Sequence, residues 1–371
     1  MLQVNVNTAD LVKAVNQAVS VSEKKSSLPV LAYFLVEAIE DRLVITASDL
    51  ETTIRETCPA VVYSPGKLTV PAKQFHSVVR AVNGDSINLK EGEQLTLELV
   101  VGQFRTTFLG LSVENFPKLV DISEMTFREL PAENLRLAID KVIYSVAGRG
   151  ERYNLSGVYM VLEEVEDKKS IRFVTSDSKR LNISTVLDNA GDFELDRGVI
   201  LSKKGVQELR KVAEEVEFIE IAVSFSCVVA KTRTSVLQFQ LLEGGFPDYR
   251  GVIPVNHDRE AKIDRKRFLE TLKRVALISD DQARVGKFEF SRGRLTINLE
   301  NPSIGQTEES LPIDYDGDDL TTGFNVFFFI ESLSVLASDL VSLVFTDSKV
   351  SFLLTATEDP GYFGIIMASK L

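Results

Sequence analysis

Histidine and cysteine are scarce in this chain of 371 residues, which holds two of each. A histidine-rich metal site is therefore excluded, because histidine is the commonest metal ligand near neutral pH. The two cysteines, Cys58 and Cys227, lie far apart in the sequence, so they provide neither a zinc set nor a disulfide framework. We expect both to be small buried apolar side chains.

Long apolar runs and catalytic signatures are missing as well. The longest apolar run covers residues 30–36, whereas a membrane helix needs roughly 18 apolar residues. No phosphate-binding loop occurs, and the glycines at 148 and 150 do not continue into a dinucleotide-binding fingerprint. No secretory signal opens the chain. We expect a cytoplasmic protein that has no membrane partner, and we recognise no cofactor, metal or catalytic residue in the sequence.

One pattern occurs three times in the chain, starting at Thr69, Ile200 and Phe324. Each copy reads as a short extended start, a helix of about three turns and then alternating strands. The apolar positions of the three helices share one phase, carried by Phe75, Val78, Val79 and Val82, by Val206, Leu209 and Val212, and by Ile330, Leu333 and Leu336. Such repetition predicts similar structural units in tandem.

A second helix precedes each of these segments, in windows 8–20, 132–146 and 264–279. The first is expected to begin with Thr8 as its N-cap. Strands follow each window, near 42–50, 171–178 and 294–299. Each third of the chain thus has the order helix, strands, helix, strands. This order predicts an α+β protein of three repeated domains, at 1–123, 124–254 and 255–371.

Charge is distributed unevenly between helices and strands. The net charge is −12, yet the six helix windows hold 14 basic and 7 acidic residues. This segregation is typical of a nucleic-acid surface on an acidic protein, although solvated helix faces give the same pattern. The loop at 149–153 adds two arginines and a tyrosine, which suit phosphates and base stacking, or which form a plain surface loop. No base-reading motif is present, so any such binding is expected to be independent of sequence.

Several short motifs follow in order along the whole chain. They are Leu-Pro-Val-Leu at 28–31, Val-Pro-Ala-Lys at 70–73, Arg-Tyr-Asn-Leu-Ser-Gly at 152–157, Phe-Pro-Asp-Tyr-Arg at 246–250 and Gly-Phe-Asn-Val at 323–326. In order and spacing they resemble the bacterial DNA polymerase III beta subunit family, the DNA sliding clamps. The resemblance implies the DNA clamp fold, in which each domain packs two helices on antiparallel sheets. It also implies a head-to-tail homodimer that forms a six-domain ring.

The function implied by the resemblance is that of a processivity factor in DNA replication. Such a ring encircles double-stranded DNA without reading its sequence. It tethers the replicative DNA polymerase, the clamp loader and repair proteins, which bind through short linear peptides.

The resemblance and the basic helices together suggest three sets of site residues. The candidate DNA contacts are Lys25, Lys73, Arg80, Arg136, Lys141, Arg149, Arg152, Tyr153, Lys203, Lys204 and Arg210. The candidate pocket for partner peptides comprises Leu155, Ser176, Lys179, Arg180, Leu181, Pro247, Val252, Ile365 and Met367. The candidate dimer interface comprises Phe108, Leu277 and Ile278.

The chain departs from the family pattern at the pocket. Ser178 and Lys179 stand where relatives often have glycine and histidine, and Gly251 stands where arginine is common. Two other classes of function remain open. The acidic stretch at 314–319 could be a metal loop of an enzyme, although it lacks EF-hand spacing and is better explained as a solvated hairpin. The other class that remains open is a repeat scaffold that binds proteins but no DNA.

Overall fold

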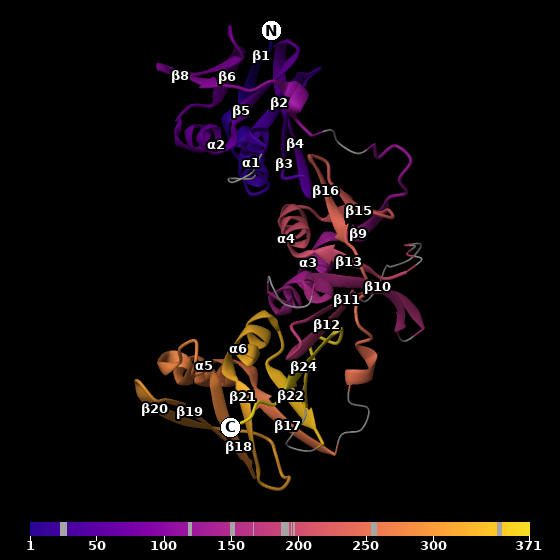
Figure 1. Cartoon of the computed structure of the whole chain (residues 1–371), viewed down its shortest axis with the longest axis vertical. Helices are drawn as coiled ribbons and strands as arrows, with labels where there is room; N and C mark the ends of the chain where they lie inside the picture. The colour runs from indigo at the N-terminus through magenta and orange to yellow at the C-terminus, as the bar shows by residue number, and fades with distance from the viewer. Residues whose placement is uncertain are drawn as a thin grey trace. The chain divides into compact units, whose positions relative to one another are not determined.

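A computed structural model describes residues 1–22, 28–117, 121–148, 153–165, 167–186, 193, 195, 197–253, 258–346 and 351–371. Within these ranges it has six α-helices (Figure 1), and each overlaps one of the six predicted windows, 8–20, 73–82, 132–146, 203–213, 264–279 and 327–338, although α2 and α6 begin one residue before theirs. They are α1 (Thr8–Val19), α2 (Ala72–Ala81), α3 (Ala132–Asp140), α4 (Lys203–Val212), α5 (Arg265–Val275) and α6 (Val326–Val335). None of the helices in the described ranges combines the length and the apolarity needed to cross a membrane.

The prediction of Thr8 as the N-cap of α1 was wrong by one residue. The side chain of Asn7 accepts hydrogen bonds from the backbone N–H groups of Ala9 and Asp10, and its backbone is extended. Asn7 ends the preceding strand, so its amide oxygen lies one position ahead of the helix, where it reaches the free N–H groups. The caps of α5 and α6 are Asp264 and Asn325.

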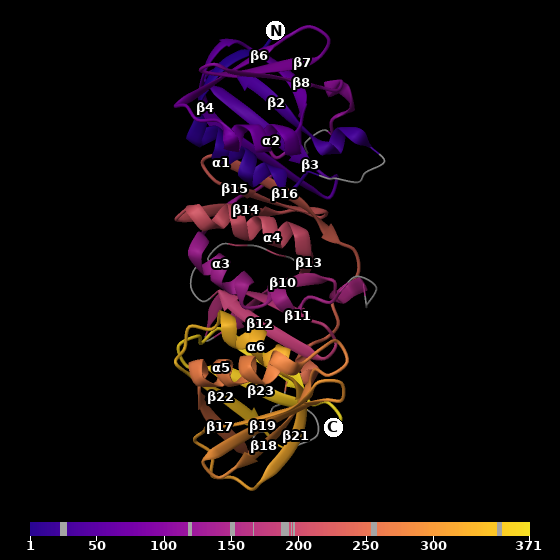
Figure 2. The same ribbon diagram turned by 90° about the vertical axis from the view of Figure 1, so that its left-hand side faces the viewer.

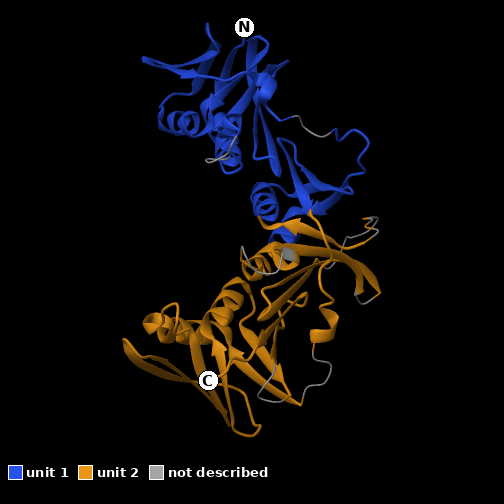
Figure 3. Ribbon diagram, viewed as in Figure 1, with its two compact units in different colours: residues 1–136, 204–241 blue, residues 137–203, 242–371 orange. Residues whose placement is uncertain are grey.

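The chain divides into two compact units (Figure 3), one of residues 1–136 and 204–241 and the other of residues 137–203 and 242–371. The predicted middle domain therefore contributes to both. The division follows from strand pairing: a strand late in the middle domain joins the sheet of the first domain, and an earlier one joins the sheet of the third. We describe each unit separately.

The first unit is built from antiparallel strands with α1 and α2 in contact with each other. Its long strand β4 pairs with β1 through its second half and with β3 and β16 through its first half. The strands are β1 (Gln3–Asn7), β2 (Tyr33–Ile39), β3 (Arg42–Ser48), β4 (Thr52–Ser64), β5 (Gly66–Pro71), β6 (Ser86–Glu91), β7 (Thr96–Val101), β8 (Phe104–Leu109), β9 (Arg128–Pro131), β14 (Phe218–Val223), β15 (Cys227–Lys231) and β16 (Ser235–Leu242).

The second unit contains an antiparallel sheet in the order β13-β10-β11-β12-β24-β23-β22-β17 and another in the order β20-β19-β18-β21. Figure 2 shows α5 and α6 side by side in front of β22 and β23. The strands are β10 (Gly157–Val165), β11 (Lys168–Ser176), β12 (Arg180–Val186), β13 (Val199–Ser202), β17 (Arg259–Asp264), β18 (Val285–Ser291), β19 (Arg294–Asn301), β20 (Gly305–Pro312), β21 (Leu320–Asn325), β22 (Leu340–Phe345), β23 (Ser351–Ala356) and β24 (Tyr362–Met367).

The apolar side chains at the repeated helix positions face the interior. Phe75 and Val79 of α2 are buried, as are Val206, Leu209 and Val212 of α4. In α6, Leu333 is buried while Ile330 is half-buried against the same core. Burial of one face at this spacing is what an amphipathic helix on a sheet requires, so the repeat in the sequence reflects a repeat in packing.

Candidate functional site

The ladder between β12 and β24 brings residues of the predicted pocket together. Leu181 pairs with Ile365, and both side chains are buried. One step further, the backbone N–H of Met367 donates to the carbonyl oxygen of Lys179 at 2.9 Å. Residues from the second and third predicted domains thus lie side by side because their strands share one sheet.

An apolar cluster forms over this ladder. Leu181 and Ile365 pack with three other buried side chains, those of Val174, Ile183 and Tyr249. Partly buried aromatic and aliphatic residues surround them, namely Tyr159, Phe246, Ile253, Leu353 and Phe363. The segment that precedes β17 therefore packs against the junction of the two strands.

Two apolar side chains of the predicted pocket remain largely open to solvent. Val252, in the short helix η6 (Arg250–Val252), is 52% exposed, and Met367 is 41% exposed. Pro247 is half-buried beside Phe246, whose ring stacks on Tyr159 at 4.9 Å between centroids. Exposed apolar groups next to a buried apolar floor are typical of a groove that receives a partner. We call the predicted set of Leu181, Pro247, Val252, Ile365 and Met367 the groove, as the candidate site for partner peptides.

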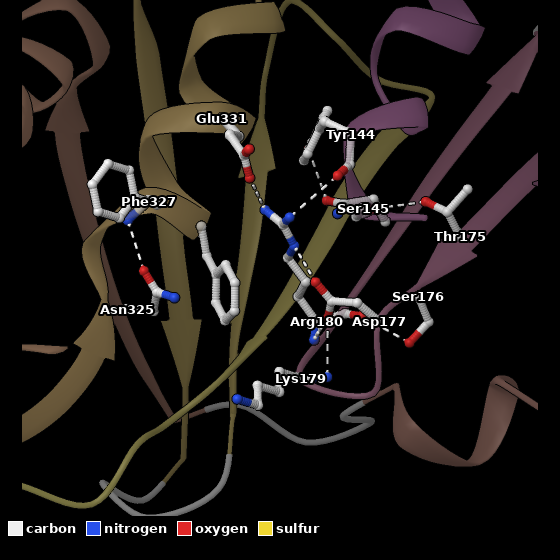
Figure 4. A network of polar contacts seen from close by, with 12 residues as sticks. Tyr144, Ser145, Thr175, Ser176, Asp177, Lys179, Arg180, Asn325, Phe327 and Glu331 are labelled. Carbon is white, nitrogen blue, oxygen red and sulfur yellow. Dashed lines mark hydrogen bonds and ion pairs between the residues drawn. The ribbon is translucent and has the colours of Figure 1, made fainter. Parts of the chain in front are cut away.

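Arg180, another predicted pocket residue, is buried under the groove (Figure 4). Its guanidinium donates to Asp177 at 2.9 Å, to Glu331 of α6 at 2.5 Å and to the carbonyl oxygen of Tyr144 at 3.3 Å. The same group lies 4.4 Å from the centre of the Phe328 ring. Most N–H donors of the guanidinium thus have partners inside the protein, and Arg180 links β12 to α6.

The turn between β11 and β12 presents the next residues of the set. Asp177 accepts from the backbone N–H groups of Lys179 and Arg180, and Ser176 donates to the carbonyl oxygen of Arg180. Ser178 has φ = 71°, in the left-handed region that favours glycine. A glycine at this position would adopt this conformation at no steric cost. Lys179 is exposed at the edge of the groove.

A buried polar network lies beneath the same ladder. Asn182 of β12 accepts hydrogen bonds from the hydroxyls of Tyr144 at 3.0 Å and Tyr362 at 2.9 Å, and the hydroxyl oxygen of Tyr144 also lies 3.0 Å from that of Ser332 of α6. Burial raises the pKa of both tyrosines, so both are neutral. The sequence analysis missed this network, because its members are single polar residues in otherwise apolar segments.

Lys141 takes part in a second link at this junction. Its side chain is 16% exposed, and its ammonium lies 2.6 Å from a carboxylate oxygen of Asp359. Burial alone would raise the pKa of Asp359, but Lys141 and the N–H groups of Ala337 and Ser338 outweigh it and lower that pKa. A contact between Lys141 and DNA would have to break this pair.

The remaining pocket residue, Leu155, is buried in the short helix η4 (Tyr153–Leu155). On β10, Glu163 accepts from Tyr249 at 2.7 Å and forms ion pairs with Arg172 and Arg250. Burial, together with Glu163, raises the pKa of Tyr249 to about 12. The charges on this side of the groove are therefore paired.

The candidate DNA contacts fall into three groups. Lys73 and Arg80 of α2 are exposed, and Lys203 of α4 is half-buried; no ion pair is found for them within the described ranges. Three others interact with neighbouring groups. Lys204 forms an ion pair with Asp49, and Arg210 lies 3.8 Å from Glu214. Arg136 is half-buried in α3 and also has a partner. Lys25, Arg149, Arg152 and the side chain of Tyr153 lie outside the described residues.

The candidate interface residues differ in exposure. Leu277 is 81% exposed in the short helix η7 (Ala276–Ile278), while Ile278 packs partly against the core of the third domain. Phe108 of β8 is buried against Phe75, with 5.5 Å between ring centres. Among the described strands, β8 and β20 each pair with one neighbour only. Each therefore offers an open edge, which suits contact with another chain.

The described residues contain no group of three or more histidine, cysteine, aspartate or glutamate side chains arranged to hold a metal ion. In the acidic stretch at 314–319, the backbone of Asp314 pairs with Lys262, and the hydroxyl of Tyr315 donates to the carbonyl oxygen of Asp318.

Both cysteines are buried and free, as expected. His76 lies 2.8 Å from the side-chain oxygen of Asn16, and burial lowers its pKa.

Three repeats of helices on antiparallel sheets, joined by ladders across the domain boundaries, define a DNA clamp fold. Family models of the DNA polymerase III beta subunit match the whole length: the N-terminal domain at residues 2–120, the central domain at 129–248 and the C-terminal domain at 250–370. The chain therefore belongs to the DNA polymerase III beta subunit family.

Curated relatives agree with this assignment. The Beta sliding clamp of Caulobacter vibrioides is 27% identical, with 100% of both chains covered. That of Pseudomonas putida is 29% identical over 97% of this chain and 98% of its own.

Solved structures are similar over the full length. The DNA polymerase sliding clamp from Caulobacter crescentus gives a TM-score of 0.92 at 27% identity, with both chains fully covered. A sliding clamp from Bartonella birtlesii, bound to griselimycin, gives 0.93 at 25% identity, again with both chains fully covered.

Proposed function

We propose that two copies of this chain close head to tail into a ring around duplex DNA and that the groove holds partner proteins. The partners are the replicative polymerase, the clamp loader and repair proteins, each bound through a short linear peptide in the cytoplasm. The role is mechanical and not enzymatic. The observation that carries the proposal is the full-length family match together with the apolar cluster that lies where β12 meets β24.

The groove has the features that linear peptides require. A flexible peptide loses conformational entropy on binding, so its affinity must come from a few apolar anchors in a preformed cleft. Here the floor is rigid, because Leu181 and Ile365 are buried in a continuous ladder. Val252 and Met367 remain exposed and would gain apolar burial with an anchor.

Weak contacts to DNA are sufficient for such a ring. The exposed cations Lys73 and Arg80, with Lys203, would attract phosphates without reading bases. Closure around the duplex would keep the protein on DNA while it moves along it. A polymerase held in the groove would then stay near the primer end at high effective concentration.

Retention on circular and linear DNA tests the proposal directly. Rings loaded on a nicked circle should remain bound through gel filtration and should leave within minutes after one double-strand cut. Blocking both ends of the cut DNA with bulky proteins should restore retention. Equal retention on open linear and circular DNA would overturn the topological mechanism.

A further inference from the structure

The basic residues of α2 and α4 differ in their surroundings. In α2, Lys73 and Arg80 are exposed and form no ion pair within the described ranges. In α4, three of the four basic residues lie beside a carboxylate. The pairs are Lys204 with Asp49, Lys211 with Glu208 at 2.9 Å, and Arg210 with Glu214 at 3.8 Å. Most of the positive charge of α4 is therefore balanced within the protein.

A cleft beside α4 shows the same balance. It has a volume of about 390 Å³ and is lined by α1, the end of α4 and the short helix η5 (Ala213–Glu215) that follows it, all in the first unit. Lys13 of α1 and Glu215 of η5 form an ion pair in its lining, which also includes Lys211 and Glu214. The charges of these two lysines and two glutamates cancel. The side chains of Lys13 and Glu215 are 52% and 53% exposed, so a ligand can reach both.

Exposed pairs of this kind are easily exchanged. An ion pair between solvated side chains contributes little in water, because solvent screens it and both side chains lose freedom. A DNA phosphate that approaches Lys13 would replace the carboxylate of Glu215, so the lysine would exchange one anion for another. The gain per phosphate is then smaller than for a cation such as Lys73, since Glu215 also repels the phosphate.

We propose that Glu214 and Glu215 lower the affinity of the α1–α4 cleft for duplex DNA, so that phosphates exchange with protein carboxylates as the duplex moves past. The inference rests on the proposed binding of DNA and assigns residues that set its strength. It also adds Lys13, which the sequence analysis did not include, to the candidate DNA contacts.

Replacement of the carboxylates by amides of the same shape tests this in the full-length protein. Fluorescence anisotropy gives the dissociation constant for a short labelled duplex, which can thread a ring without a clamp loader, at several potassium chloride concentrations. The variants are Glu215→Gln, Glu214→Gln with Glu215→Gln, and Lys13→Gln with Glu215→Gln.

Glu40→Gln is the matched control. Glu40 lies in the turn between β2 and β3, is 69% exposed and pairs with Arg42 at 2.6 Å. It is not among the residues that line the cleft. This variant therefore makes the same change in net charge, and also releases an exposed cation, at a different place on the first unit.

Glu215→Gln should bind the duplex about two- to five-fold more tightly than the unmodified protein at low salt. The slope of log affinity against log salt should steepen by up to about 0.9, because one more cation faces the phosphates. Replacing Glu214 as well should increase both effects. The variant that lacks both Lys13 and Glu215 should return to the affinity of the unmodified protein, and Glu40→Gln should match it throughout.

Equal affinities and slopes for Glu215→Gln and the unmodified protein, with both bound to the duplex, would overturn the inference and leave DNA binding intact. A gain of the same size in Glu40→Gln would also overturn it, because net charge alone would then explain the result. A gain that persists without Lys13 would remove that residue from the contacts. Failure of every protein to bind the duplex at low salt would instead overturn the proposed contact with DNA.

Discussion

Glu56 is a carboxylate buried between two strands of the first unit. It lies on β4 and is 3% exposed; one of its oxygens accepts from Ser235 of β16 at 2.8 Å, and the other has no hydrogen-bond partner within the described structure. Burial raises its pKa to about 8, although Ser235 and Lys13 act in the opposite direction. A buried carboxyl of this kind favours its protonated form at neutral pH.

This shift makes the stability of the protein depend on pH. Between the unfolded pKa near 4.3 and the folded pKa of about 8, the folded state binds more protons, so stability falls as pH rises. Glu56→Gln removes the titration. We expect the variant to gain about 1–3 kcal/mol over the unmodified protein between pH 5 and pH 8. Urea unfolding at both pH values checks this, and parallel pH dependence of the two proteins would contradict it.

Ser178 shows how one backbone angle limits the choice of residue. Its φ of 71° costs a residue with a Cβ about 1–2 kcal/mol, which glycine avoids. Because glycine loses more entropy on folding, we expect Ser178→Gly to stabilise the protein by up to about 1 kcal/mol. Ser178→Val should destabilise it, since a branched Cβ tolerates this region poorly. Thermal unfolding should therefore rank glycine above serine and serine above valine; any other order would contradict the argument.

At the level of elements, β24 and the short helix η6 supply the exposed walls of the groove. Val252→Ala and Met367→Ala together remove two apolar contact surfaces without touching the buried ladder. We expect peptide affinity to fall at least tenfold, about 1.4 kcal/mol, in titration calorimetry. Leu340→Ala is a matched control, because Leu340 is also exposed and apolar. It lies beside Val341, which pairs with Ala356 at the end of β23, whereas Met367 pairs with Ser351 at the start of β23. The two side chains therefore lie at opposite ends of that strand. Equal affinities in both variants would move the peptide site elsewhere.

Elements with a regular period were predictable from the sequence, and contacts between distant segments were not. The helices around Phe75, Leu209 and Leu333 follow from apolar spacing, because spacing alone decides which face is buried. The burial of Arg180 does not follow, since its partner Glu331 comes 151 residues later in the chain. The resemblance indicated the groove, but only the strand register shows that Lys179 lies beside Met367.

For the whole molecule, closure of a dimer should depend on Leu277. Its side chain is 81% exposed and outside the core, whereas Ile278 also packs against its own domain. Leu277→Ala should weaken the dimer at least tenfold without unfolding the monomer, because apolar anchors dominate interfaces. Sedimentation velocity from nanomolar to micromolar concentration measures this, with Leu340→Ala as the control. Identical profiles for the two variants would place the interface away from η7.

The shared ladder of β12 and β24 also has a consequence for synthesis on the ribosome. Tyr362 of β24 follows Asn182 of β12 by 180 residues. At ordinary rates of translation, β12 therefore waits about 10–40 s for the strand that covers its edge. During that time Leu181 and Ile183 lack their partners on β24, Ile365 and Phe363, and an unpaired strand edge invites aggregation. On the function proposed above, a nascent chain that ends after two domains would lack a complete groove and would not compete with finished copies for partner peptides.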